Sequence, residues 1–437
     1  MQTLPQDFLD FVRRSPTAFH AADTICRMLD AEGFVRLNEQ EPWQPRLTPG
    51  GRYYVTRNRS SVVAFALPEG DFSHFQLVVS HSDSPMFKLK PGAENVSVDR
   101  YLRLNVERYG SMIMSTWMDR PLSIAGRVLV REGNRVTTRL VDLGRDALLI
   151  PNLPIHFNRE VNDGYRFNAQ IDMQPLYGSA DAKGALLKEI ADCAGVRVED
   201  IVGRDLFLYN RMPGTVWGAR GEFFSSPRID DLECAFTSLQ AFLRAPAAHH
   251  INLCAILDNE EVGSSSRQGA DSTLLHDVML RATEALGMDD GRSRGAIAAS
   301  FMISADNAHA IHPNHPEKFD ALNCTAMNEG LVIKHNAHLK YATDGVSAAL
   351  LSEICKAAGV PVQHFVNRSD LPGGSTLGSI ANAHVSMHAA DVGLAQLAMH
   401  SSYETAGVHD IAHMVNALTA FYTTHVAVHA DGEYELR

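Results

Sequence analysis

Short, largely apolar segments of strand length alternate with segments of helical periodicity near both ends of this 437-residue chain. A strand that is apolar along most of its length is buried on both faces, which is typical of parallel sheets with helices packed on either side. The alternation therefore predicts an α/β fold with a mostly parallel sheet and helices on both faces. The apolar segments are SVVAFAL (61–67), FQLVVSH (75–81), INLCAIL (251–257) and a run over 297–304.

The predicted helices follow apolar residues spaced three or four positions apart. Residues 5–31 show this spacing, and Ser15-Pro16-Thr17 divides them into two helices because these residues are typical of a break. Further elements are expected after residue 220: helices over 231–245, 344–358 and 404–423, and a strand over 361–366.

The middle of the chain has a different pattern of apolar and polar residues. From about Asn95 to Arg220, apolar and polar residues alternate between turn signals, which is typical of half-buried strands, and only 179–195 shows helical periodicity. A chain of 437 residues also exceeds the length at which one core keeps growing. We therefore expect a discontinuous main domain, residues 1–94 and 221–437, interrupted by an inserted β-rich domain, residues 95–220.

Charge and cysteine usage exclude several classes of function. The chain has 39 basic and 51 acidic residues, a formal net charge of −12, which argues against nucleic acid or an anionic membrane as partner. No apolar run is long enough to span a bilayer, and no export signal is recognised. The six cysteines show no CxxC spacing. A reducing, cytoplasmic location is therefore expected, without disulfides or a thiolate metal site.

Histidines and carboxylates stand in five short motifs, mostly where an apolar segment ends. Ligands in a parallel sheet bind outside the carboxyl ends of the strands, so these side chains are expected to converge. Two imidazoles and three carboxylates suit two zinc or manganese ions, with cobalt as a further possibility, that share one bridging carboxylate. The predicted metal ligands are His81, Asp230, Glu261, Asp306 and His400.

Three acidic residues beside these ligands have expected roles of their own. Glu260 precedes a ligand and follows a buried strand, so we expect it to act as the general base that takes a proton from water. Asp83 lies two residues after His81, where a carboxylate fixes the orientation of an imidazole. Asp230 and Asp231 open a helix: Asp230 is expected to bridge the metals and Asp231 to cap the helix, although ordinary acidic residues at a helix start are an alternative.

Other candidate side chains are less specific. His309 and His312 fit structural or hydrogen-bonding roles, although His312, before Pro313, is also placed where it can line a substrate pocket. Serines in GSSS (263–266) and GGSTLG (373–378) are not in a GxSxG elbow, and the second motif lacks the GK[ST] of a phosphate loop. Neither serine catalysis nor nucleotide binding is therefore predicted.

Taken together, the motifs resemble those of the aspartyl aminopeptidase and yeast vacuolar aminopeptidase I family of co-catalytic zinc exopeptidases, along nearly the whole chain. The resemblance implies a zinc exopeptidase-like fold. It also implies one zinc held by Asp230, Glu261 and His400 and a second held by His81, Asp230 and Asp306, with Glu260 as base. The matching motifs are HSDSP, RIDD, DNEEVGS, SADNAHAIHPN, IKHNAHLKYAT, GGSTLG and LAMHSSYE.

The resemblance also has implications beyond the metals. The inserted domain would mediate dimerisation within a homododecamer, and His156 would enter the site of a neighbouring subunit. Lys334 matches a lysine that would attract an acidic substrate side chain. Lys340 stands where the family often has arginine, which leaves the preference between acidic and apolar N-termini open.

The expected function is that of a cytoplasmic dizinc aminopeptidase that removes single N-terminal residues, acidic ones first, from peptides. Three alternatives remain at this point. One is a preference for neutral or apolar N-termini, and another is a deacylase or carboxypeptidase on the same scaffold. A non-enzymatic, shell-like scaffold particle is the third, and the complete ligand set argues against it.

Overall fold

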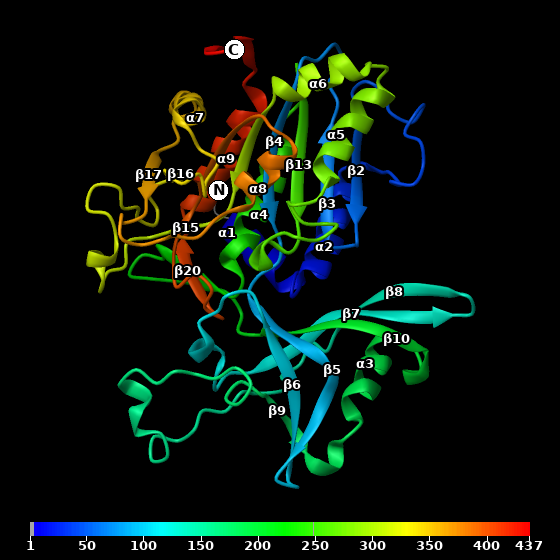
Figure 1. Ribbon diagram of the computed structural model, residues 1–437, viewed down its shortest axis with the longest axis vertical. Helices are drawn as coiled ribbons and strands as arrows, with labels where there is room; N and C mark the ends of the chain where they lie inside the picture. Colours follow the sequence, from blue (N-terminus) through cyan, green and yellow to red (C-terminus); the bar gives the residue numbers. More distant parts are fainter. Residues whose placement is uncertain (1–3, 248) are drawn as a thin grey trace.

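The computed structural model describes residues 4–247 and 249–437, and within these ranges the largest sheet has nine strands (Figure 1). The central strands β13, β4, β14 and β18 are parallel to one another, whereas β3 and β16 pair with this group in antiparallel fashion. Across the sheet the order is β1 (Val35–Arg36), β2 (Arg52–Arg57), β3 (Ser61–Ala66), β13 (Ile251–Leu257), β4 (Phe75–His81), β14 (Phe301–Ala305), β18 (His388–Gly393), β16 (Leu331–His335) and β17 (Val362–Val366).

Helices cover both faces of this sheet. Side chains alternate along each strand, so Val78 of β4 belongs to one hydrophobic core and Val79 to the other. The first core lies under α1 (Leu4–Arg14), α2 (Ala18–Ala31), α4 (Ile229–Arg244), α7 (Gly345–Ala357) and α9 (Asp410–Thr423). The second core lies under α5 (Leu274–Ala285), α6 (Asp290–Ala298) and α8 (Leu377–His384).

A smaller antiparallel sheet lies below the main sheet in Figure 1 and has a separate hydrophobic core with α3 (Ala185–Ala194). Alternating apolar residues such as Leu104 and Val106 point into this core, as period-two patterning requires. Its strands, in order, are β8 (Arg135–Asp142), β7 (Leu122–Glu132), β10 (Ile201–Asn210), β5 (Met86–Ser97), β6 (Tyr101–Tyr109) and β9 (Leu176–Ser179).

Two further groups of strands complete the described chain. A five-stranded sheet lies beside the carboxyl end of the main sheet and has the order β11 (Thr215–Trp217), β12 (Phe223–Ser226), β20 (Glu404–Gly407), β19 (Ala395–Leu397) and β15 (Ala308–His309). A hairpin of β21 (Val426–Ala430) and β22 (Glu433–Leu436) follows α9.

The predicted α/β class, with a mostly parallel sheet between helices, is confirmed. Two predicted elements were wrong in part. The strand expected over 297–304 begins only at Phe301, because the alanine-rich residues before it end α6. The helix expected over 404–423 begins at Asp410, because 404–407 pairs with β12 as strand β20. In the portion of the chain that the structure describes, no helix is long and apolar enough to cross a membrane.

Candidate metal centre

The five predicted ligands lie at the carboxyl end of the main sheet or in loops beside it. His81 is the last residue of β4, and Asp306 directly follows β14. Glu261 lies in the 3-10 turn Glu260–Val262, a few residues after β13. Asp230 is in the first turn of α4, and His400 lies between β19 and β20. His81, Asp306 and Glu261 are therefore positioned by the ends of strands. The first turn of α4 and the loop between β19 and β20 bring Asp230 and His400 to the same edge.

A first group of possible ligands surrounds His81. The carboxylate oxygens of Asp230, Asp231 and Asp306 and a ring nitrogen of His81 lie within 4.8 Å of one another. His81 Nε2 is 3.6 Å from Asp230 Oδ1 and 3.9 Å from Asp306 Oδ1. All four residues are buried, so their polar atoms face one another and not bulk water.

A second group surrounds His400 and shares Asp230 with the first. Asp230, Glu261 and His400 offer ligand atoms within 4.8 Å of one another. His400 Nε2 is 3.4 Å from Asp230 Oδ2 and 3.5 Å from Glu261 Oε2. The two carboxylate oxygens of Asp230 thus face different histidines, which is the geometry expected of a bridging ligand.

The electrostatics of the cluster fit divalent cations. Burial, followed by repulsion from Asp230, raises the pKa of Glu261 well above its ordinary value, and burial likewise raises the pKa of Asp231. Among the described residues, Asp230 Oδ1, Asp231 Oδ1 and Glu261 Oε1 are buried oxygens without a hydrogen-bond partner. Buried carboxylates without partners are costly unless a cation compensates their charge. Imidazole and carboxylate are ligands that zinc accepts, so the residues fit this ion.

Glu260 lies beside the two groups without belonging to either. Its side chain is 15% exposed, and Glu260 Oε2 is 4.0 Å from His81 Nε2. Burial, with further repulsion from Asp306, raises the pKa of Glu260 to about 8. A carboxylate that faces the cluster from its rim and is not needed as a ligand can accept and return a proton.

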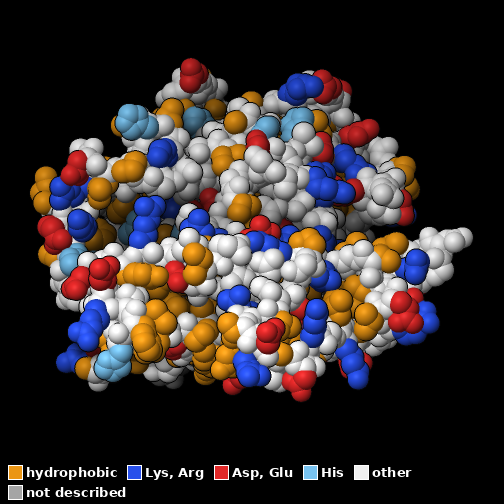
Figure 2. Space-filling view, turned by 60° about the horizontal axis from the view of Figure 1, so that its bottom comes forward, with side chains coloured by type: hydrophobic (Ala, Val, Ile, Leu, Met, Phe, Trp, Pro, Cys, Tyr) orange, Lys and Arg blue, Asp and Glu red, His pale blue; other side chains and the backbone are white. Residues whose placement is uncertain are grey.

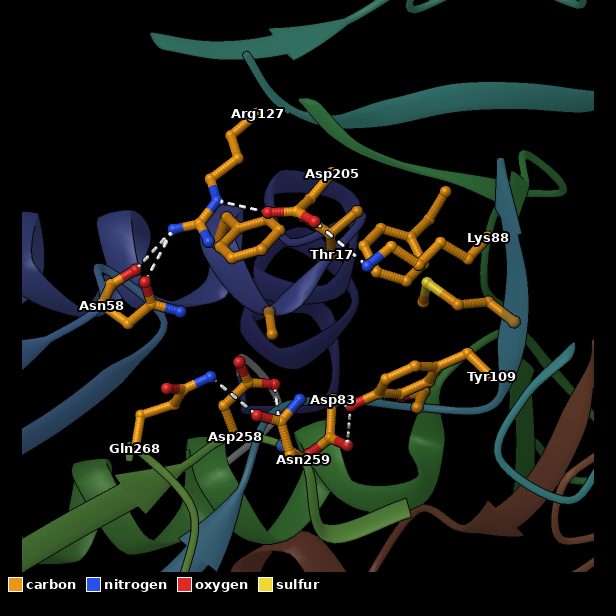
Figure 3. A pocket seen from close by; sticks show the side chains of 15 residues that line it. Thr17, Asn58, Asp83, Lys88, Tyr109, Arg127, Asp205, Asp258, Asn259 and Gln268 are labelled. Atoms are coloured by element: carbon orange, nitrogen blue, oxygen red, sulfur yellow. Dashed lines mark hydrogen bonds and ion pairs between the residues drawn. The ribbon is translucent and has the colours of Figure 1, made fainter. Parts of the chain in front are cut away.

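Asp83 contacts the segments that carry His81 and Glu261, and Figure 3 shows its side chain beside Tyr109. Asp83 Oδ1 is 3.4 Å from His81 Nδ1, and the backbone carbonyl of Asp83 is 3.1 Å from the same nitrogen. Its carboxylate also accepts hydrogen bonds from the amides of Glu260 at 3.1 Å and Glu261 at 3.2 Å and from the Tyr109 hydroxyl at 2.7 Å. One side chain therefore fixes an imidazole and the turn that bears both glutamates.

Tyr109 and Asn259 line a cavity of about 120 Å³ behind Asp83, between the main and smaller sheets (Figure 3). Asn259 Nδ2 donates to the Tyr109 hydroxyl at 2.8 Å, which in turn donates to Asp83. Tyr109 belongs to β6 of the smaller sheet, so that sheet supports the metal centre directly. The sequence contained no motif that pointed to Tyr109.

Asp231 and Glu404 have positions that the sequence did not predict. The backbone leaves the helical conformation at Asp230 and Asp231, and Asp231 Oδ2 accepts a hydrogen bond from the His81 amide at 3.2 Å. Glu404 accepts from the amides of Asp230 at 3.1 Å and His400 at 2.8 Å. The only sequence signal for Glu404 was its place in LAMHSSYE, four residues after His400.

The three remaining candidates are not members of the two ligand groups. Lys334 is buried: its ammonium nitrogen is 3.7 Å from Asp306 Oδ2 and donates to the Asn307 carbonyl at 3.1 Å. Burial opposes its charge, but Asp306 raises the pKa of Lys334 above its ordinary value. His312 is half-buried and accepts from the Asn314 amide at 3.2 Å. His156 is exposed, and within the described chain no side-chain hydrogen bond, ion pair or ligand group includes it.

Comparisons with known proteins agree with this geometry. The family described as aminopeptidase I zinc metalloprotease (M18) matches residues 11–422. A probable M18 family aminopeptidase 2 of Clostridium acetobutylicum is 42% identical over 422 residues, which cover 95% of this chain and 97% of that protein. Its counterpart in Pseudomonas aeruginosa is 40% identical over 429 residues and covers 96% and 98% of the two chains.

Solved structures show the same similarity. The cryo-EM structure of the Ape4 and Nbr1 complex contains a chain that is 35% identical, with a TM-score of 0.93 and coverage of 96% of this chain and 85% of that one. The S. cerevisiae mApe1 dodecamer is 29% identical, with a TM-score of 0.84 and coverage of 95% of both chains.

Proposed function

Because the chain belongs to the aminopeptidase I zinc metalloprotease (M18) family, and is therefore a metal-dependent aminopeptidase, we propose that it uses two zinc ions to release single N-terminal residues from peptides. One observation supports the presence of two ions. The oxygens of Asp230 face two separate ligand groups, one with His81 and Asp306 and the other with Glu261 and His400. A shared carboxylate keeps two cations close while it offsets their repulsion.

In the proposed mechanism, some side chains keep the metal ligands in position and Glu260 transfers a proton. Zinc bound there supplies a Lewis acid for the scissile carbonyl and lowers the pKa of water. Glu260 accepts the proton of the attacking water and returns it to the leaving amine. Asp83 keeps the His81 ring and the turn of Glu260 in place, and Glu404 does the same for Asp230 and His400. These contacts preset the geometry before substrate binds.

For the substrate we propose acidic N-terminal residues first, on the basis of the motif likeness to aspartyl aminopeptidases. The position of Lys334 favours the alternative, a neutral or apolar residue, because its ammonium group already faces Asp306 and Asn307. An acidic side chain would have to draw on other donors. His312 remains a candidate that lines the pocket, since it is half-buried in the loop that follows β15.

We also propose self-association into a homododecamer built from dimers, with residues 95–220 as the oligomerisation domain and residues 1–94 and 221–437 as the catalytic domain. The mApe1 relative is a dodecamer. Hydrophobic side chains gather on the lower half of Figure 2, over the smaller sheet. Exposed large hydrophobic residues there include Val98, Tyr101, Ile113, Leu153, Ile155, Phe157 and Ile171.

The proposed assembly would bring His156 close to a neighbouring subunit. It lies next to the exposed residues Ile155 and Phe157, so an interface that covers these would carry His156 to a neighbouring subunit. We propose that it donates a hydrogen bond to the oxyanion in that neighbour's site. A cytoplasmic location is proposed as well, because all six cysteines are free, as is usual in a reducing compartment.

The test is a panel of aminoacyl chromogenic substrates with Asp, Glu, Ala and Leu N-termini, assayed with and without chelator. Zinc-dependent cleavage with a preference for Asp and Glu is expected. A preference for Ala or Leu would replace the acidic specificity by the neutral one. Cleavage of N-acetylated substrates, or of peptides only from the carboxyl end, would instead indicate a deacylase or carboxypeptidase. Zinc titration of the apoprotein that saturates at one ion would contradict the dizinc assignment.

A further inference from the structure

Three histidines gather at the edge of the main sheet opposite the candidate metal centre. His74 precedes β4 and His250 precedes β13, whereas the metal centre lies after the same two strands. Each strand has seven residues, so at ~3.3 Å per residue the two ends are about 23 Å apart. His425 joins them from the segment between α9 and β21, at the top of Figure 1. This second cluster is therefore separate from the site described above.

The three rings are close enough to share one ion. A ring nitrogen from each of His74, His250 and His425 lies within 4.8 Å of the other two. The ring centroids are 5.2 Å apart for His74 and His250, and 4.9 Å apart for His74 and His425. An ion bound tetrahedrally at 2.0–2.1 Å from each nitrogen would hold the nitrogens about 3.3 Å apart. The His74 and His250 rings are stacked at 29° and the His250 and His425 rings at 21°, so the rings must turn for all three nitrogens to face one ion.

Hydrogen bonds at the far side of two rings leave lone pairs available. His250 Nε2 is 2.9 Å from the carbonyl oxygen of Tyr422, which can only accept, so Nε2 carries the proton and Nδ1 carries a lone pair. Both His250 Nδ1 and His425 Nδ1 are buried and have no hydrogen-bond partner among the residues that the structure describes. Such orphaned nitrogens are costly in a neutral, metal-free cluster.

His74 has the same tautomer for a similar reason. Its Nε2 is 3.2 Å from Gln76 Oε1, and this oxygen also accepts from the Val426 amide at 3.2 Å. Nε2 of His74 must therefore donate, which leaves the lone pair on Nδ1; the Ser73 hydroxyl donates to this nitrogen at 2.8 Å and would have to turn away when an ion binds. A ring N–H held by a carbonyl or amide oxygen is the arrangement by which proteins orient metal-binding histidines.

Burial keeps these rings neutral and a cavity gives access to them. Burial lowers the pKa of His74 and of His250 to about 4, so neither ring carries a charge at neutral pH. An open cavity of about 560 Å³ is lined by His250, His425, Asp71 and the cationic Arg437. Solvent can therefore reach two of the three rings, and a water molecule can complete a coordination shell.

We propose that His74, His250 and His425 form a second metal site, which binds one imidazole-preferring transition ion such as zinc and is not part of the catalytic centre. The ion would connect the segment after α9 to the starts of two central strands. Its role is then structural, since the ligands come from parts of the chain that otherwise meet only through packing and hydrogen bonds.

The experiment compares zinc bound per subunit in the wild-type protein and in His425→Ala, after zinc loading and gel filtration, by mass spectrometry of metals. The wild type is expected to hold one zinc more than His425→Ala, however many ions the catalytic centre holds. His429→Ala is the matched control, because His429 is an exposed histidine of β21 that pairs with Glu435. It should keep the wild-type zinc content. Equal zinc in wild type and His425→Ala would overturn the proposal.

Two further measurements keep the test decisive if His425→Ala folds poorly. Added zinc should raise the melting temperature of the wild type more than that of His250→Gln, with peptidase activity equal in both. Zinc-soaked wild-type crystals should also show an anomalous peak between the three rings. A crystal with zinc at Asp230 and none between His74, His250 and His425 would overturn the second site while leaving the catalytic centre intact.

Discussion

Asp230 faces two histidines at once, with one oxygen 3.6 Å from His81 Nε2 and the other 3.4 Å from His400 Nε2. Asp230→Asn keeps the shape of the side chain but removes the charge that would offset two cations. We expect both ions of the catalytic centre to be lost or strongly weakened. Glu261→Gln and Asp306→Asn should each affect mainly one. Metal analysis in the His425→Ala background, which removes the proposed second site, that finds one ion fully retained after Asp230→Asn would show that this residue does not bridge.

Glu260 is the residue whose change should separate chemistry from metal binding. Glu260→Gln keeps the size of the side chain and removes the proton acceptor, so turnover should fall by ~10²–10⁴-fold with unchanged zinc content. Glu284→Gln, on the exposed surface of α5, is a control that should leave turnover unchanged. Near-normal turnover in a zinc-replete Glu260→Gln enzyme would remove Glu260 from the mechanism.

The buried acids predict how stability depends on pH when the metals are removed. Burial raises the pKa of Glu260 and of Glu404 to about 8, whereas an unfolded glutamate has a pKa of about 4.3. The folded apoprotein therefore binds more protons than the unfolded chain between about pH 4 and 8, so its free energy of unfolding falls as pH rises, by about 1.4 kcal/mol per proton and pH unit.

Zinc should remove most of this dependence, because it favours the ionised carboxylates in the folded state. The melting temperature of chelated protein is expected to drop between pH 6 and pH 8, whereas that of zinc-loaded protein should change much less. Thermal scans of both forms over this range provide the measurement. Parallel curves would show that the carboxylate cluster does not interact with the metal.

The sequence led to the ligands because each stands at a strand end or in a distinctive loop motif. It could not separate Asp230 from Asp231, since both precede the same helix and only the fold decides which atoms face His81 and His400. Tyr109 could not be predicted from the sequence for another reason. Its contact with Asp83 joins two sheets, and no local pattern encodes such a contact.

At the scale of elements, β18 passes so close to the end of β14 that only glycine fits at Gly393. A Cβ there would overlap the backbone carbonyl oxygen of Asp306 and lie 2.9 Å from the Ala308 amide nitrogen. Gly393→Ala should therefore cost about 1–3 kcal/mol of stability and displace Asp306, with reduced zinc affinity. Denaturant unfolding and zinc titration measure both. Gly70→Ala, where a Cβ meets nothing within 4 Å, is the control.

The predicted elements were most accurate where burial was uniform. INLCAIL and FQLVVSH became β13 and β4 with the expected bounds, because an apolar segment of that length fits only the centre of a covered sheet. The run over 297–304 contains alanines, which suit a helix as well as a strand. In the structure α6 extends to Ala298 and strand β14 begins at Phe301. Residues 404–407 became a strand because β12 was available as a partner.

At the scale of the whole molecule, the proposed role of His156 can be tested by mixing inactive subunits. His156→Ala should lower turnover by roughly 10²–10³-fold if it is a preset oxyanion donor, with zinc content and assembly size unchanged. When His156→Ala and Glu260→Gln subunits are co-assembled, activity should return, because some sites combine an intact base with a neighbour's intact histidine. Absence of recovery in assemblies that native mass confirms as mixed would exclude a role across the interface.

The proposed ligands of the catalytic centre are spread over most of the chain, from His81 to His400. A ribosome makes the chain from its N-terminus, and His400 emerges only after nearly all of the main sheet has been synthesised. Until then Asp230 and Glu261 have no histidine to complete their group. On the proposed ligand assignment, the growing polypeptide would be inactive as a peptidase until its synthesis is almost complete, and it would not trim the N-termini of neighbouring nascent chains before then.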